Sequence, residues 1–502
     1  MRATVAKKTL EKHLYSDKPK QQLSTASLLA NSLCPWQTPE EEQVARQQLS
    51  QNQLNVFRSQ LPLILKGFKQ IPDHRNPKKI KHKITVLMLY GLLMFVFRFA
   101  SRREVNREMT RPLFEKNLKE FFPELDTLPH ADTLHRVLKK IEIEQFEQLQ
   151  LNVLNALIRK KKFKRYLINN CYPVAIDGSQ KLARKVLFTE ELLQRKKSKK
   201  KDANNKDKLN EDEDEDEDEE YQYYIYVLEA NLSFHNGMVI PLLSEFLEYQ
   251  LGDQQNSKQD CELRAFRRLC KKIKSYFSHL PILLLLDGLY ANGPLMKYCQ
   301  KKNWQYMIVL QKADLKTVWR EFNSLSTIQK NNQYQQEWNG REQYFTWVNQ
   351  IEYDFDNGKK TMTVHLVVCD EYWQEVNSFG EVEQKHSRHA WLSSRELKMH
   401  NVHERCNLGA RYRWGIEANF LVEKHQGYHY EHCFSLNWNA LKGYHLLMRL
   451  AHLFNVLALF SVALGAVDLL CLYFNQPTSV ARLNNKPKLM YWHSFFPTYR
   501  NV

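Results

Sequence analysis

Hydrophobic residues in the first third of the chain recur at the spacing of helices. In residues 40–70 they recur every three or four positions, as at Leu54, Phe57, Leu61 and Leu65, and this spacing places side chains on one helix face. Residues 84–97 form a predominantly apolar run, and residues 130–141 combine an apolar face with bases. The pattern predicts a flexible basic arm at 1–40 and a helical, DNA-binding domain at 41–165, although a basic helix face is also typical of ordinary solvated helices.

After residue 165 the apolar runs become short, as in strands. Residues 172–177 form one such run, and residues 221–234 and 238–246 are separated by His-Asn-Gly, a hairpin signal. Residues 281–287 are apolar up to a terminal acid, as expected of a strand buried on both faces. Helical spacing at 260–276 and 295–302 alternates with these runs, so residues 166–318 are expected to form the first part of a mixed α/β core.

The remaining chain is expected to add a β-rich insertion and then helices. Alternating residues in 319–389 predict the insertion, residues 390–475 the second part of the core with a helical C-terminal segment, and residues 476–502 a tail. Leu453–Phe474 is long enough to cross a membrane, but it contains Asn455, Ser461 and Asp468, and a charge near mid-span is costly in lipid. We therefore favour a buried helix and expect no membrane partner.

Charge narrows the class of partner. The chain has 73 Lys and Arg residues against 56 Asp and Glu residues, a formal net charge of +17. Residues 195–220 form a low-complexity loop of bases followed by ten consecutive acids. The excess of bases on a chain with 43% hydrophobic residues indicates a folded protein with a polyanionic partner, either nucleic acid or an anionic membrane surface. Nine cysteines without C-x-x-C pairs and a polar N-terminus favour a cytoplasmic, nucleoid-associated location.

Three acids stand out as candidate metal ligands. Asp177 and Asp287 each follow an apolar run and precede a glycine. Glu417 lies between Arg413 and Lys424 at spacings that place all three on one stripe of a helix. Carboxylates that lie close together repel one another unless a cation is present, and oxygen ligands suit Mg²⁺ or Mn²⁺. The stripe is also compatible with a plain helix salt-bridge ladder.

The same residues resemble a known family. The segments VAIDGSQ (174–180), LLLLDG (283–288) and YRWGIEANFLVEK (412–424) are similar to DDE transposases of bacterial insertion sequences, in the branch with a Y-x2-R-x3-E-x6-K signature around the third acid. The resemblance extends over roughly residues 60 to 460. One position departs from it: the signature's tyrosine corresponds to Ala410, with Tyr412 close by.

The resemblance implies a structure, a reaction and partners. It implies an RNase H-like mixed-sheet core in which Asp177, Asp287 and Glu417 bind two Mg²⁺ or Mn²⁺ ions. The reaction would be cleavage of DNA strands at the ends of a mobile element and their transfer into target DNA. The partners would be double-stranded DNA, as terminal inverted repeats and target, and a second copy of the chain in a synaptic homodimer. The expected DNA-binding residues are Arg413, Lys424, Tyr412, Arg136 and Lys139.

Two other classes of function compete with the enzyme. A catalytically inactive or domesticated transposase-derived protein would keep DNA binding and lose cleavage. A membrane protein would be anchored by Leu453–Phe474. A zinc site is not expected, because the spacing of the neighbouring histidines and cysteines fits no tetrahedral pattern; these residues are His403, Cys406, His429, His432 and Cys433.

Overall fold

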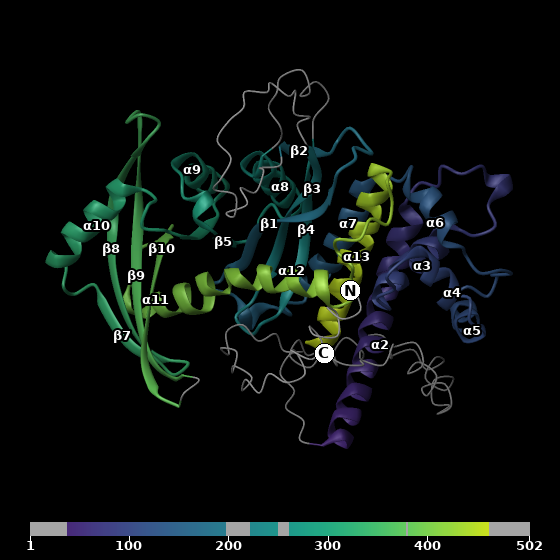
Figure 1. Ribbon diagram of the computed structural model, residues 1–502, viewed down its shortest axis with the longest axis horizontal. Coiled ribbons are helices and arrows are strands. Elements are labelled where there is room, and N and C mark those ends of the chain that lie inside the picture. Colours follow the sequence, from purple (N-terminus) through teal and green to yellow (C-terminus); the bar gives the residue numbers. More distant parts are fainter. Residues whose placement is uncertain (1–37, 197–220, 249–260, 378–379, 461–502) are drawn as a thin grey trace, which may run out of the picture. The chain divides into compact units, whose positions relative to one another are not determined.

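The structure is a computed structural model that describes residues 38–196, 221–248, 261–377 and 380–460. The described residues form two compact units (Figure 1). Unit 1 comprises residues 287–300 and 306–410, and unit 2 comprises the other described residues. Both units combine strands with helices, so the mixed α/β class predicted from the sequence is confirmed. Most of the arm expected at 1–40, most of the charged loop expected at 195–220 and the whole tail at 476–502 lie outside the described residues. Residues 39–40 already belong to a helix and residues 195–196 to a strand.

Unit 2 begins with a group of helices. They are α2 (Pro39–Gln70), α3 (Ile84–Val96), α4 (Arg102–Glu108), α5 (Pro112–Phe121), α6 (Ala131–Leu138) and α7 (Ile143–Arg159). Local sequence sets their starts: the Thr38 hydroxyl accepts a hydrogen bond from the Glu41 amide at 3.2 Å, and Ser101 caps α4 in the same way through Glu104. The amphipathic face predicted in residues 130–141 is confirmed, because its leucines and valine are buried.

The helix α13 (Trp438–Leu459) is central to the core of unit 2. It packs against α2, α3, α6, α7 and the strand β4, and nearly all of its residues are buried (Figure 1). The apolar run at residues 84–97 is explained by the same packing, since α3 is covered on every side. No helix within the described ranges is long and apolar enough to span a membrane. The second half of Leu453–Phe474 lies outside those ranges.

The sheet of unit 2 is mixed. Its strands are β1 (Tyr172–Arg184), β2 (Leu193–Lys196), β3 (Tyr221–Ser233), β4 (Val239–Leu247) and β5 (Ile282–Leu286). β3 pairs antiparallel with β1 on one edge and with β2 and β4 on the other, whereas β1 and β5 are parallel. The predicted hairpin is therefore present, with Gly237 at a φ of 83° in its turn. The helices α8 (Glu262–Tyr276) and α12 (Gly415–His425) pack on this sheet.

One predicted strand end is wrong. We expected the first strand to stop at Asp177, but β1 continues to Arg184. The parallel register with β5 is recorded only from Tyr172 to Ala175, and the antiparallel ladder with β3 carries β1 onward to Arg184. Asp177 therefore lies within a strand, two residues beyond the last pair that β1 makes with β5.

Unit 1 contains long antiparallel strands and helices. The elements are η5 (Gly288–Tyr290), α9 (Gly293–Lys302), β6 (Gln305–Val309), α10 (Lys316–Ile328), β7 (Gln333–Trp338), β8 (Arg341–Phe355), β9 (Lys360–Val376), β10 (Val382–Ser393), α11 (Met399–His403) and the π-helix η6 (Glu404–Gly409). The strand order is β6-β10-β9-β8-β7. The segment expected to be β-rich from residue 319 begins instead inside α10, which buries Val318 and Phe322 and packs on β8.

Candidate active site in unit 2

The structure brings two of the three predicted acids together through one arginine. The Arg413 Nη2 donates to Glu417 Oε1 at 2.8 Å, and Nη1 lies 3.5 Å from Asp177 Oδ2. The Arg413 side chain is 6% exposed, that of Asp177 19% and that of Glu417 37%, so the pair of carboxylates opens to solvent on the side of Glu417. Arg413 thus links Glu417, on the same helical stripe, to Asp177, which lies 236 positions before the arginine in the sequence.

The first turn of α12 is fixed against β3. The Ser233 hydroxyl donates to the Tyr412 carbonyl oxygen in η7 (Ala410–Trp414), just before α12 begins. Gly415 faces the same serine, and a Cβ atom at this position would collide with Ser233 Oγ and lie 3.0 Å from Val239 Cγ2. The glycine next to Glu417 is therefore required by close packing, which sets how near the helix can approach the sheet.

The glycine after Asp177 has a similar role. A Cβ atom at Gly178 would overlap the ring and hydroxyl of Tyr226 on β3. The Gly178 amide donates to Asp177 Oδ1 at 2.8 Å, so this carboxylate is oriented by its own backbone on one oxygen and by Arg413 on the other.

Asp287 is the first residue of unit 1 and follows directly on Leu286, the last residue of β5. It caps η5, because its Oδ1 accepts a hydrogen bond from the Leu289 amide at 3.0 Å. Each unit therefore carries its own part of the predicted set of acids: Asp177 and Glu417 in unit 2, and Asp287 in unit 1.

The donor set of unit 2 fits a hard divalent cation in its chemistry. Asp177 and Glu417 supply only oxygen donors, and both side chains keep some exposure to solvent. Among the residues that the structure describes, no three Asp, Glu, His or Cys side chains converge into a metal-binding group, and this includes the zinc candidates considered above.

The predicted DNA-binding residues lie in different surroundings. Lys424 is 21% exposed and pairs with Glu431 at 3.1 Å. Tyr412 is half-buried beside His235, and burial raises the pKa of its phenol. Arg136 and Lys139 are exposed on or next to the last turn of α6. Arg413, by contrast, is buried against the two acids, with the Trp414 ring 4.6 Å from its guanidinium carbon.

Sequence reasoning missed a buried lysine on the strand that carries Asp177. The Lys181 Nζ donates to the Tyr430 carbonyl oxygen at 2.6 Å and lies 4.3 Å from the centre of the Tyr430 ring. Burial lowers the pKa of Lys181 to about 8, although Glu229 and Glu423 act in the opposite direction. The alternation along β1 is the only signal in the sequence that could have placed this lysine on the same face as Asp177.

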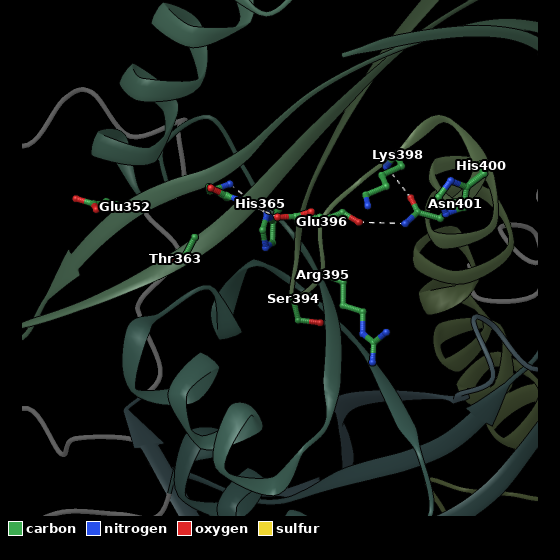
Figure 2. Close-up of a pocket in the computed structure, with 10 residues that line it drawn as sticks. Glu352, Thr363, His365, Ser394, Arg395, Glu396, Lys398, His400 and Asn401 are labelled. Carbon is green, nitrogen blue, oxygen red and sulfur yellow. Dashed lines mark hydrogen bonds between the residues drawn. The ribbon is translucent and has the colours of Figure 1, made fainter. Parts of the chain in front are cut away.

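A separate polar pocket of ≈ 680 Å³ lies in unit 1 (Figure 2). A β-bulge in β8 builds one wall, because Gln350 adopts a φ of 60°, its amide donates to His365 Nδ1 and its side chain donates to Glu396 at 2.6 Å. Burial lowers the pKa of His365. The other lining residues are Glu352, Thr363, Ser394, Arg395, Lys398, His400 and Asn401. Both acidic and basic side chains line this pocket, so the charge of the lining does not favour one class of ligand. No motif in the sequence singled it out.

A comparison with known protein families finds a match in the N-terminal part of the chain. Residues 65–153 match the model of a family described as DDE_Tnp_1-associated. The match covers the end of α2 and all of α3 to α6, together with most of α7. No curated protein matches the chain. The helical region that precedes the candidate site therefore indicates a relationship to DDE-type transposases.

Proposed function

We propose that the protein is a DDE-type transposase that cleaves DNA strands at the ends of a mobile element and transfers them into target DNA. The observation that carries the proposal is the joining of Asp177 and Glu417 by Arg413. The acids come from a central strand and from a helix more than 200 residues later, as the transposase resemblance implies. The family match at residues 65–153 supports the same conclusion independently, because it does not include any of these residues.

The sheet of unit 2 supports an RNase H-like core. In the order β4-β3-β1-β5, the pairs β4-β3 and β3-β1 are antiparallel and the pair β1-β5 is parallel. In this order β1 is central, with β3 on one side and β5 on the other, and Asp177 lies on β1. Asp287 follows β5 in the chain, and the register pairs Ala175 with Leu285, two residues before each aspartate. Asp287 is proposed as the third acid on the resemblance to DDE transposases.

The protein's own groups would orient the reacting phosphodiester and balance its charge. Asp177, Asp287 and Glu417 would hold two Mg²⁺ or Mn²⁺ ions, which supply Lewis-acid stabilisation of the charge that develops on the phosphoryl oxygens. Arg413 neutralises the two acids of unit 2 and keeps their side chains oriented. Lys424, seven residues after Glu417 on α12, presents a cation for a backbone phosphate, and the exposed Arg136 and Lys139 would contact DNA further from the site.

Two ends of an element must be brought together before strands are joined, so we propose that the chain acts as a homodimer on DNA. Its DNA partners would be the terminal inverted repeats and a target duplex. The excess of 73 bases over 56 acids supports a polyanionic partner of this kind.

A cleavage assay tests the proposal. Purified protein is incubated with Mg²⁺ and linear duplexes that carry the sequences flanking its gene, and strand breaks are mapped on denaturing gels. We expect breaks with the wild type and with Glu124→Gln, an exposed acid paired only with Lys83 on the surface, and none with Asp177→Asn or Glu417→Gln. Binding without breaks in the wild type would favour the inactive, transposase-derived DNA-binding protein. Equal cleavage by Asp177→Asn would exclude the proposed metal site.

A further inference from the structure

A cluster of fully buried charges lies beneath the candidate site. Arg449 on α13 contacts Glu423 on α12 at 2.8 Å and Glu229 on β3 at 3.1 Å, and none of the three side chains is exposed. Arg449 also donates to Asn231 on β3, and the His452 Nδ1 donates to Glu423 at 2.7 Å. One guanidinium thus links the sheet to α12.

One end of this link lies beside a candidate acid, and the other end lies on the helix that carries the second candidate acid. Glu229 is the direct antiparallel partner of Asp177 in the ladder between β1 and β3. Residues directly opposite in such a ladder place their side chains on the same face of the sheet. Glu423 lies on the helix that carries Glu417, and α12 packs against β1, β3 and β4.

The contacts therefore form a closed ring. On one side Arg413 joins Asp177 to Glu417 directly. On the other side Arg449 joins Glu229, beside Asp177, to Glu423, which follows Glu417 on the same helix. The separation of the two acids is thus fixed at two points, one at the site and one beneath it.

Stability alone does not account for such a cluster. Desolvation of buried ions offsets most of their attraction, and well-packed neutral replacements are often as stable. Burial alone would raise the pKa of Glu423, but Arg449 and His452 lower it to about 2, so this carboxylate stays charged. His445 lies 3.2 Å from Glu229, and burial lowers the pKa of this histidine and that of His452. Arg449 is the largest influence that keeps both acids charged, and both acids also attract the buried Lys181.

We propose that Arg449, with Glu229 and Glu423, is a positioning group that sets the distance between Asp177 and Glu417 for divalent-metal binding. This inference rests on the proposed function. Residues behind metal ligands usually change metal affinity or activity by roughly tenfold to a hundredfold when replaced. We expect changes of that size here.

The test compares three proteins. Arg449→Met removes the link but leaves two buried acids unpaired, so it is combined with Glu229→Gln and Glu423→Gln into a neutral triple variant of similar side-chain volume, in which the two glutamines keep hydrogen-bonding groups at positions 229 and 423. Lys272→Met is the matched control, because Lys272 also bridges two acids of unit 2, Glu147 and Glu245 at 3.0 Å each, but links neither to α12. Thermal melting first establishes that each variant is folded.

Three quantities are measured: the cleavage rate, the dependence of this rate on Mg²⁺ concentration, and the Kd of Mn²⁺. The Mn²⁺ Kd is measured by electron paramagnetic resonance on the protein without DNA. The folded triple variant should cleave roughly tenfold to a hundredfold more slowly, and its half-saturating Mg²⁺ concentration and Mn²⁺ Kd should rise by about tenfold or more. DNA affinity and all values for Lys272→Met should match the wild type. A folded triple variant with wild-type metal dependence would overturn the inference. If the wild type does not cleave, the proposed function fails, and the Mn²⁺ Kd alone then decides whether Arg449 positions the two acids.

Discussion

The contact between Gly415 and Ser233 gives a stability prediction that can be worked out from the structure. Gly415→Ala places a methyl group against Ser233 Oγ at a distance that real Cβ atoms do not adopt, with Val239 Cγ2 at 3.0 Å on the other side. The Ser233 hydroxyl cannot simply turn away, because it donates to the Tyr412 carbonyl oxygen. The substitution must therefore shift the start of α12 away from β3.

Two effects of opposite sign set the magnitude. Overpacking of a tight contact costs about 1–3 kcal/mol, whereas alanine is favoured over glycine within a helix by roughly 1 kcal/mol. Together they give a decrease in the free energy of unfolding of about 0–2 kcal/mol for Gly415→Ala, and the overlap of the new methyl group with Ser233 Oγ favours the upper half of this range. Ser233→Ala alone loses one hydrogen bond, worth about 1 kcal/mol. The double variant removes the worst overlap, because the Ser233 Cβ is 3.7 Å away, an ordinary contact distance, although the contact with Val239 Cγ2 at 3.0 Å remains tight.

A double-mutant cycle measured by urea denaturation isolates this contact. The free energy of unfolding of the double variant should exceed the value expected from adding the two single effects, and the difference should be about 1 kcal/mol or more. The control cycle pairs Gly415→Ala with Ser275→Ala, an exposed serine on α8, and should be additive. Additive effects in the first cycle, or a Gly415→Ala variant as stable as the wild type, would refute the packing account of this glycine.

Three further predictions concern charge and packing. Because the folded-state pKa of Glu423, about 2, lies below its ordinary value of 4.5, this carboxylate stabilises the fold above pH 4.5 and loses that effect as the pH falls towards 2. Glu423→Gln should therefore flatten the decline of the unfolding free energy across this range in urea titrations, and an unchanged slope would contradict the assignment. Replacing the exposed Arg136 and Lys139 by alanine should lower the slope of log Kd against log salt concentration by about 2 in fluorescence anisotropy with duplex DNA, without changing the melting temperature. Gly178→Ala should lower the melting temperature through its overlap with Tyr226, and Tyr226→Ala in the same chain should recover part of that loss.

The spacing of apolar residues predicted most of the helices and strands, because a helix brings every third or fourth side chain to one face and a strand every second one. The predicted helix at 40–70 is α2, and the hairpin flanking His-Asn-Gly is β3 and β4. The errors arose where a partner strand or neighbouring helix decided the outcome. β1 runs past Asp177 because β3 continues to pair with it, and α10 was overlooked although Val318 and Phe322 have helical spacing.

The site was only partly predictable for a similar reason. The resemblance named Asp177 and Glu417, and these acids share Arg413 in the structure. The cluster around Arg449 had no sequence signal, because the contacts that define it join β3, α12 and α13 only after folding. The polar pocket of unit 1 depends on a bulge at Gln350, which a simple alternation of residues does not reveal.

The two bases that flank Glu417 differ in their availability to DNA. The Arg413 side chain is 6% exposed and donates to both acids, so binding a phosphate would require it to give up contacts inside the protein. Removing the partner of a buried charge carries a large free-energy cost. Among the described residues, Lys424 forms an ion pair with Glu431, whose side chain is 57% exposed, and its Nζ lies 6.0 Å from the centre of the Tyr430 ring. Partly exposed ion pairs of this kind contribute little. Lys424 can therefore exchange its partner for a phosphate at low cost, whereas Arg413 is better suited to holding Asp177 and Glu417 in place.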